Sequence, residues 1–183
     1  MKKLLIPVSI LLIMTSCGDE ASQQSTTTSS STEQSAPDVQ EGNKIERPAY
    51  SLTYPSDWKI DSSDEDFSYD SYFTIDGVGE SFISFFILSN AIDPAAAVEE
   101  QVKTFSNGVV TNPEVTTFTK WGNIDGNGKL LKGKLGGALS GEVKIFATAK
   151  GEKTFLMVEQ YFDSDIEKDK PGYDMIENSF TIK

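Results

Sequence analysis

The side chains of this sequence that could do chemistry are mostly carboxylates, because the chain has 28 Asp and Glu, no His and a single Cys. Without imidazole, the Ser–His and Cys–His arrangements of nucleophilic catalysis cannot be built from this chain. Two carboxylates at a suitable separation can hydrolyse a glycosidic bond, but with so many acids such pairs arise by chance. Ser56 and Ser140 lack the Gly-x-Ser-x-Gly context of an activated serine. We therefore expect no catalytic residue and no enzymatic activity. A carboxylate-based hydrolase ranks third among the functions that we consider.

The densest group of acids lies in the first half of the chain, with no basic residue among them. Its members are Asp61, Asp64, Glu65, Asp66 and Asp70. Aromatic residues interleave these acids, and a polar rim around aromatic anchors is typical of a binding surface. We therefore name a candidate interaction patch, which consists of Asp64, Phe67, Tyr69 and Tyr72. A solvated acidic loop followed by an amphipathic strand is the simpler interpretation, because Tyr69 and Phe73 alternate with Ser71.

Residues 123–128, Asn-Ile-Asp-Gly-Asn-Gly, resemble the first half of a calcium loop, with oxygen-bearing side chains at alternate positions and Gly at the sixth. The twelfth position of such a loop needs a bidentate Glu, and Lys134 stands there instead. Asp-Gly and Asn-Gly are also strong hairpin signals. The sequence thus predicts a hairpin loop, with a cation site as the alternative, and we expect no metal and no cofactor.

The balance of charge restricts the class of partner. The chain has 16 Lys and Arg and a formal charge of −12. Binding to nucleic acid depends on basic side chains that neutralise phosphates. We therefore expect no nucleic-acid partner.

The N-terminus carries a targeting signal. Lys2 and Lys3 precede an apolar run over residues 4–14, which is too short to span a bilayer and is typical of a secretory signal. The one cysteine follows in Met14-Thr15-Ser16-Cys17, which resembles the signal of bacterial lipoproteins. The resemblance implies that residues 1–16 are removed and that Cys17 carries diacylglycerol and an N-linked acyl chain such as palmitate. A free Cys behind an ordinary signal peptide is the alternative.

The acyl chains would have to provide the membrane attachment. Removing residues 1–16 takes away two lysines, which leaves 14 basic and 28 acidic residues and a formal charge of −14. Anionic lipid repels such a chain, whereas several acyl chains together bind it firmly. Gly18 stands where the lipoprotein sorting rule places an Asp in proteins kept at the inner membrane. We therefore expect a lipid-anchored protein of the cell envelope, at the outer membrane.

A polar tether separates the cysteine from the folded domain. Thirteen of the fourteen residues from 22 to 35 are Ser, Thr or Gln. Such a segment buries too little apolar area to offset its ordering entropy. We assign residues 17–44 to the lipidated cysteine and a disordered tether, whose 27 flexible residues reach about 29 Å. Residues 45–183 then form one domain.

Strand patterns dominate this domain. Residues 50–54 alternate aromatic or apolar with polar side chains and end at Pro55, and residues 82–88 are apolar on both alternations, as in a central strand. Further strands are predicted at residues 115–121, 129–135, 141–149, 154–162 and 180–182. A turn is predicted at residues 150–153, and a turn or bulge at residues 135–138.

Two helices are predicted between the strands. The first has Asp93 as N-cap, Pro94 at its first position and a stop at Asn107-Gly108. Its apolar stripe consists of Val98, Val102 and Phe105. The second helix begins around Pro171 and directs Tyr173 and Ile176 inward.

The order of these elements resembles the PsbP-like domains, which include the DcrB-like envelope lipoproteins. Residues 50–58, Tyr-Ser-Leu-Thr-Tyr-Pro-Ser-Asp-Trp, resemble the aromatic strand and Tyr-Pro-x-x-Trp corner that open these domains. Residues 175–180, Met-Ile-Glu-Asn-Ser-Phe, resemble their closing helix and its Ser-Phe pair. The resemblance implies an α+β fold, an antiparallel β-sheet flanked by helices. No binding residue can be carried over, because Pro55, Trp58 and Phe180 have architectural roles.

Members of this family mostly bind partners or support assemblies. The resemblance therefore implies a lipid-anchored, non-enzymatic binding or assembly-support module for a protein or another envelope component. A lipoprotein that carries a small ligand or a cation is the alternative. An apolar cavity would favour the carrier, whereas a flat aromatic surface would favour the binding module.

Overall fold

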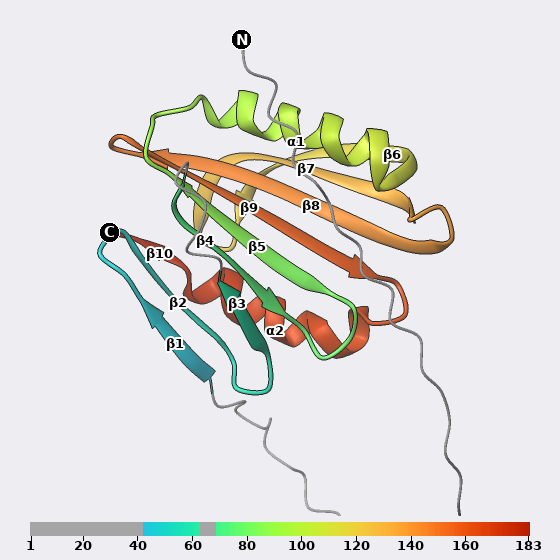
Figure 1. Cartoon of the computed structure of the whole chain (residues 1–183), viewed down its shortest axis with the longest axis horizontal. Coiled ribbons are helices and arrows are strands. Elements are labelled where there is room, and N and C mark those ends of the chain that lie inside the picture. The colour runs from blue at the N-terminus through green and yellow to red at the C-terminus, as the bar shows by residue number, and fades with distance from the viewer. Residues whose placement is uncertain (1–41, 63–68) are drawn as a thin grey trace, which may run out of the picture. The chain divides into compact units, whose positions relative to one another are not determined.

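The computed structural model describes residues 42–62 and 69–183, which form ten strands and two helices (Figure 1). The strands are β1 (Gly42–Glu46), β2 (Tyr50–Pro55), β3 (Lys59–Ser62), β4 (Tyr69–Asp76), β5 (Phe82–Leu88), β6 (Val110–Trp121), β7 (Ile124–Leu135), β8 (Leu139–Lys150), β9 (Lys153–Phe162) and β10 (Thr181–Ile182). The helices are α1 (Pro94–Gly108) and α2 (Ile166–Ser179). Within these described ranges, neither helix is long and apolar enough to cross a bilayer. β1 begins inside the segment assigned to the tether from sequence.

Seven strands form one sheet in the order β3-β4-β5-β9-β8-β7-β6, and every neighbouring pair is antiparallel. β1, β2 and β10 form a smaller antiparallel sheet. The predicted α+β class with an antiparallel sheet flanked by helices is therefore confirmed. The run at residues 82–88 is the interior strand β5, as predicted.

The two helices pack on opposite faces of the seven-stranded sheet. Successive side chains of a strand point to opposite faces, so neighbouring residues of β8 show which helix covers each face. On β8, Val143 and Ile145 belong to the hydrophobic cluster that contains Val98 of α1. Phe146 belongs to the second cluster, with Ile176 of α2. In Figure 1, α1 follows the β6–β8 part of the sheet. The second cluster also contains residues of β2, so the small sheet and α2 close the same side.

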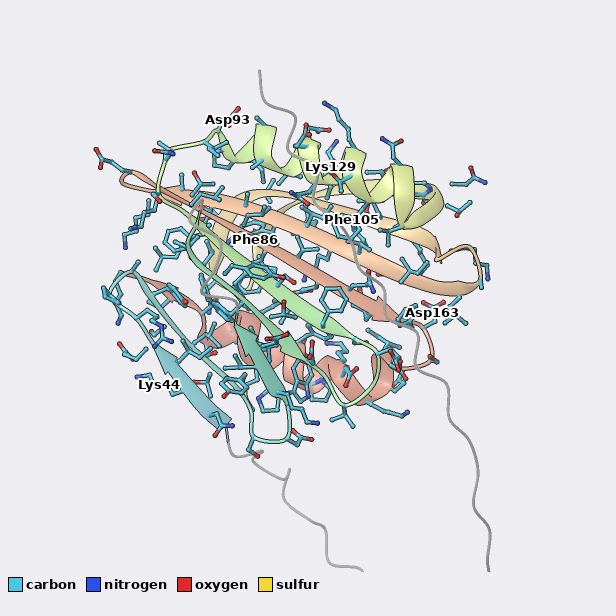
Figure 2. All side chains as sticks on the ribbon, in the orientation of Figure 1. Lys44, Phe86, Asp93, Phe105, Lys129 and Asp163 are labelled. Carbon is cyan, nitrogen blue, oxygen red and sulfur yellow. The ribbon has the colours of Figure 1, made fainter. Side chains whose placement is uncertain are left out.

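The first helix has the predicted ends and the predicted apolar stripe. The Asp93 side chain accepts a hydrogen bond from the Ala95 backbone N–H at 3.2 Å, and Pro94 stands in the first turn. Val98 is buried, while Val102 and Phe105 pack against its cluster. In Figure 2, Asp93 lies at the start of α1 and Phe105 lies on the side of the helix toward the sheet.

The second helix begins at Ile166, so the prediction of a start at Pro171 was wrong. The Asp165 carbonyl accepts hydrogen bonds from the backbone N–H groups of Lys168 and Asp169, which builds the first turn before the proline. Pro171 lacks the N–H that would bond to the Glu167 carbonyl, and its ring crowds that carbonyl, yet the helix continues to Ser179. Tyr173 and Ile176 are buried, as predicted.

The corner motif packs against the second helix. The rings of Trp58 and Tyr173 meet edge to face, with centroids 5.2 Å apart. A Cβ atom at Gly172 would lie 2.2 Å from Cζ2 of Trp58, so only glycine allows this approach. Phe180 returns to the core after the helix and lies against the rings of Phe85 and Trp121. The architectural roles inferred for Trp58 and Phe180 agree with this packing.

The predicted hairpins form, with one difference of position. Trp121 pairs with Ile124, so Gly122 (φ 55°) and Asn123 make the turn between β6 and β7. Residues 124–128 belong to β7, where the backbone is extended instead of wrapped as in a calcium loop. The predicted turns at residues 135–138 and 150–153 join β7 to β8 and β8 to β9.

Candidate functional site

Glu159 is a buried carboxylate in β9, on the face of the large sheet that α2 covers. Only 2% of its surface is exposed. Trp121 donates its indole N–H to Glu159 Oε1 at 2.6 Å. Antiparallel pairing places Lys144 of β8 directly opposite, with Nζ 3.5 Å from Glu159 Oε2. Strand register therefore brings an acid and a base together inside the fold.

Lys144 is shared between two acids. Its Nζ also donates to Glu177 Oε1 of α2 at 2.5 Å, and the backbone N–H of Gly122 donates to Glu177 Oε2 at 3.2 Å. The ammonium group lies 5.7 Å from the centroid of the Phe118 ring, within range of a cation–π contact. We call Glu159, Lys144 and Glu177 the buried charge cluster. It connects β9, β8, α2 and the β6–β7 turn.

Burial decides the protonation of this cluster. Removal from water raises the pKa of Glu159 from 4.5 to about 8, and the positive charge of Lys144 offsets only part of that effect. Burial alone would lower the pKa of Lys144, but the attraction of Glu159 and Glu177 raises it. With one lysine for two carboxylates, a proton on Glu159 leaves the cluster neutral. A carboxyl group titrating near neutral pH is typical of functional sites.

A second, more exposed group lies next to the cluster. Glu142 of β8 accepts hydrogen bonds at 2.6 Å from both the Lys132 ammonium and the Tyr161 hydroxyl. Burial would raise the pKa of Glu142, but these two hydrogen bonds lower it overall. Burial, followed by the hydrogen bond to Glu142, raises the pKa of Tyr161.

The partners of these acids show that the acids join elements of the fold through hydrogen bonds and ion pairs. Both carboxylate oxygens of Glu159, of Glu177 and of Glu142 contact other side chains or backbone groups of the fold. Glu159 is also too deeply buried to meet a substrate. The arrangement therefore fixes the packing of α2 and the β6–β7 turn on the sheet, even though its residue types could serve acid–base chemistry.

Asp169 of α2 and Asp165, the residue before the helix, hold the loop between β4 and β5. Asp169 is fully buried and accepts a hydrogen bond from the Val78 backbone N–H at 3.1 Å. The backbone N–H of Glu80 donates to Asp165 Oδ2 at 3.4 Å. Asp169 Oδ2 finds no hydrogen-bond partner among the described residues. These aspartates position a loop and form no group of metal ligands with other acids in the described ranges.

A different kind of site lies where β10 approaches the turn between β8 and β9. Two shallow hollows there, of about 380 and 370 Å³, share Lys150 and Ile182 in their walls. We call the first the lysine hollow. Its walls are formed by Pro48, Ala49, Lys150, Glu152, Lys153, Phe155, Ile182 and Lys183. Three ammonium-bearing side chains from three segments thus surround one surface depression.

The structure reaches only part of the candidate interaction patch. Asp64 and Phe67 lie outside the described residues, and Tyr69 is placed by its backbone at the start of β4. Tyr72 packs on Phe86 of β5, with ring centroids 4.8 Å apart (Phe86 is labelled in Figure 2). The patch stays a prediction. Cys17 and the residues before β1 also lie outside the described ranges.

Sequence reasoning missed both the buried charge cluster and the lysine hollow. A signal for Glu159 existed, because it interrupts the apolar alternation of Phe155 and Met157 in its strand. Nothing in the sequence relates Lys150 to Lys183, since the small sheet alone brings β10 near the β8–β9 turn.

The chain matches no protein-family model and no curated protein. Solved structures with a similar arrangement include a protein of Bacteroides thetaiotaomicron VPI-5482, at 15% identity and a TM-score of 0.48 over 78% of this chain. The match spans about half of that longer protein, 48% of its length. Another is cyanobacterial PsbP (CyanoP) from Synechocystis sp. PCC 6803, at 15% identity and a TM-score of 0.47, with 81% of this chain and 98% of that chain covered.

LpqN of Mycobacterium tuberculosis, described as involved in cell envelope biogenesis, is similar at 14% identity and a TM-score of 0.45, with 78% of this chain and 91% of that chain covered. PsbP is the family that the sequence motifs resemble. At these TM-scores the likenesses carry no functional assignment to this chain.

Proposed function

We propose that this chain is a lipid-anchored lipoprotein of the cell envelope whose domain binds a protein or another envelope component and has no enzymatic activity. The observation that carries the proposal is the order of its segments. An apolar leader ends at Cys17, a Ser/Thr/Gln-rich stretch follows, and an α+β domain with its own core occupies residues 42–183. This order suits a domain held at a membrane by lipid and free to reach a partner.

The internal use of the acids supports binding over catalysis. Glu142, Glu159 and Glu177 are the carboxylates whose surroundings most resemble a chemical site, and each is engaged by groups of the fold. The two hollows beside β10 are open and shallow. Open hollows favour recognition at a surface over the enclosed binding of a carried ligand.

The anchor is tested by labelling cells with an alkyne analogue of palmitate and separating their membranes. We expect the wild-type chain to be labelled and to sediment with the outer membrane, and the Cys17→Ser variant to be unlabelled and released. An unlabelled wild-type chain would exclude the anchor, and recovery with the inner membrane would exclude the outer-membrane site.

Partner binding is tested by cross-linking intact cells and capturing the tagged wild-type chain. A component recovered with the wild-type chain and lost in the Cys17→Ser variant would support a membrane-dependent partner. Repeated captures without any common component would contradict the binding function.

A further inference from the structure

The lysine hollow collects positive charge at one end of an acidic molecule. Lys150 ends β8, Lys153 begins β9 and Lys183 follows β10, and all three line the same depression. Arg47 stands at the neighbouring end of the small sheet, where the Lys183 ammonium donates to its carbonyl at 2.8 Å. Glu152 is the acid among the lining residues. This local excess of base contrasts with the formal charge of −12 of the whole chain.

Hydrogen bonds to the fold hold two of these ammonium groups in place. Lys150 Nζ donates to the Ile182 carbonyl at 2.8 Å. Lys183 Nζ forms an ion pair with Glu46, and the Lys183 backbone N–H donates to the Ala49 carbonyl at 2.9 Å. An ammonium group has three donors, so these bonds position each group and leave donors for a ligand. The hydrogen bond from Lys183, followed by that from Lys44, lowers the pKa of Glu46 to about 2, which reflects the positive surroundings.

The remaining wall of the hollow is apolar. It consists of Pro48, Ala49, Ile182 and the buried ring of Phe155. Cationic and apolar lining together suit a ligand in which an anionic group is joined to a less polar body. A phosphate attached to glycerol has this character, whereas a fully hydrated inorganic anion uses only the lysines.

We propose that the lysine hollow binds the phosphate headgroup of an anionic phospholipid. The proposal rests on the lipid anchor of the proposed function, which would hold the hollow near such headgroups at high local concentration. The acidic remainder of the domain is repelled by an anionic bilayer. Contact through the hollow would therefore set which end of the domain meets the membrane.

The position of the tether is compatible with this orientation. The hollow lies beside Glu46, at the end of β1 opposite to Gly42. A strand of five residues is about 13 Å long, and the 24 residues from 18 to 41, taken as the random coil that the sequence predicts, would span about 27 Å. The anchor can therefore stay in the bilayer while the hollow touches its surface. Lys44, in the middle of β1, is labelled in Figure 2.

The test uses the chain from Gly18 to Lys183 without lipid, which retains both hydrophobic clusters of the domain. Its sedimentation is measured with phosphatidylglycerol vesicles and with phosphatidylcholine vesicles at low salt. Binding to the anionic vesicles alone is expected. Replacing one lysine near an anionic surface weakens binding about fivefold, so Lys150→Ala with Lys153→Ala is expected to weaken it about 25-fold.

A matched control removes the same charge elsewhere. Lys103→Ala with Lys168→Ala changes two exposed lysines of α1 and α2, and we expect vesicle binding within twofold of the wild-type chain. Equal losses in the two double variants would show general electrostatics and overturn the site. Absence of vesicle binding by the wild-type chain would overturn it too.

Titration with inorganic phosphate, followed by amide chemical shifts, separates the two sources of the anion. Lysine-dependent shifts without vesicle binding would overturn the lipid assignment. The chain from Gly18 to Lys183 lacks Cys17 and carries no lipid, so these results do not depend on whether Cys17 is acylated in the cell. Failure of the anchor and failure of the hollow are therefore distinguishable.

Discussion

Lys144 and Lys150 stand on the same strand, β8, and meet opposite environments. Lys144 is partly buried between Glu159 and Glu177, and its charge is neutralised inside the fold. Lys150 stands at the end of the strand, where Lys153 and Lys183 line the same hollow. The attraction between opposite charges that are packed together offsets the hydration that they lose. Such pairs therefore fix the positions of the elements that carry them. Like charges gathered at a surface raise the local positive potential, which attracts an external anion.

The first way to break this comparison is to remove the internal lysine. Lys144→Met leaves two carboxylates without a counter-charge, and losing one partner of a buried pair costs about 4 kcal/mol. We expect this loss of unfolding free energy in urea at pH 8, and a smaller loss at pH 5, where Glu159 carries a proton and needs no counter-charge. Lys132→Met is the control, because its side chain is 60% exposed and solvent screens its ion pair with Glu142, so a smaller loss is expected. Equal losses in the two variants would contradict the special role of Lys144.

The second test changes the protonation of the cluster. Folded Glu159, with its pKa near 8, keeps a proton that the unfolded chain releases above pH 4.5. The folded state thus binds more protons over this window, and its stability must fall as the pH rises. Between pH 5 and 8 the expected fall is about 3 kcal/mol in the unfolding free energy. Glu159→Gln should make this range flat, and an unchanged slope would show that another group is responsible.

The third test compares glycines beside the two regions. Gly122 has φ 55°, and a Cβ atom there would lie 2.0 Å from the Glu177 carbonyl oxygen. Gly151, in the turn next to the lysine hollow, has φ 63° and nothing within 4 Å of such an atom. Gly122→Ala should cost about 2 kcal/mol and Gly151→Ala about 1 kcal/mol, because only the first adds a clash to backbone strain. Thermal unfolding measures both, and a reversed order would refute the tight packing of α2 on the turn.

The smallest effect on stability is expected at the hollow. Lys150→Ala with Lys153→Ala should change the unfolding free energy by only about 0.5 kcal/mol, as for other surface changes. Combined with the expected loss of vesicle binding, this result would assign these lysines to recognition. A loss of several kcal/mol would place them with Lys144 as structural groups.

Local patterns in the sequence predicted much of the fold. The alternation over residues 50–55, the cap at Asp93 and the turn at residues 150–153 each depend on neighbouring residues, and each is found as predicted. The start of α2 was predicted wrongly. Pro171 is typical of the first turn of a helix, but the helix begins at Ile166, where the Asp165 carbonyl accepts the first hydrogen bonds. The turn before β7 lies at Gly122-Asn123. The sequence has several glycines that could form this turn, and the pairing of Trp121 with Ile124 selects the first of them.

The sites were much less predictable than the elements. The residues chosen from sequence were conspicuous by local density, as in the acid-rich stretch around Asp64. Glu159 interrupts an apolar alternation in the sequence, but its shifted pKa comes from burial and its partner Trp121 lies 38 residues away along the chain. No local pattern encodes these distances.

By itself, the sequence determined the excess of acid, the absence of imidazole and the strand and helix periods, since these depend on composition and near neighbours. It also places Cys17 directly behind an apolar leader. Only the tertiary structure decided which charges meet. The β8–β9 register set Lys144 against Glu159, α2 added Glu177, and the return of the chain through β10 brought Lys183 beside Lys150. Electrostatic interaction depends on separation and burial, and both are properties of the packed fold.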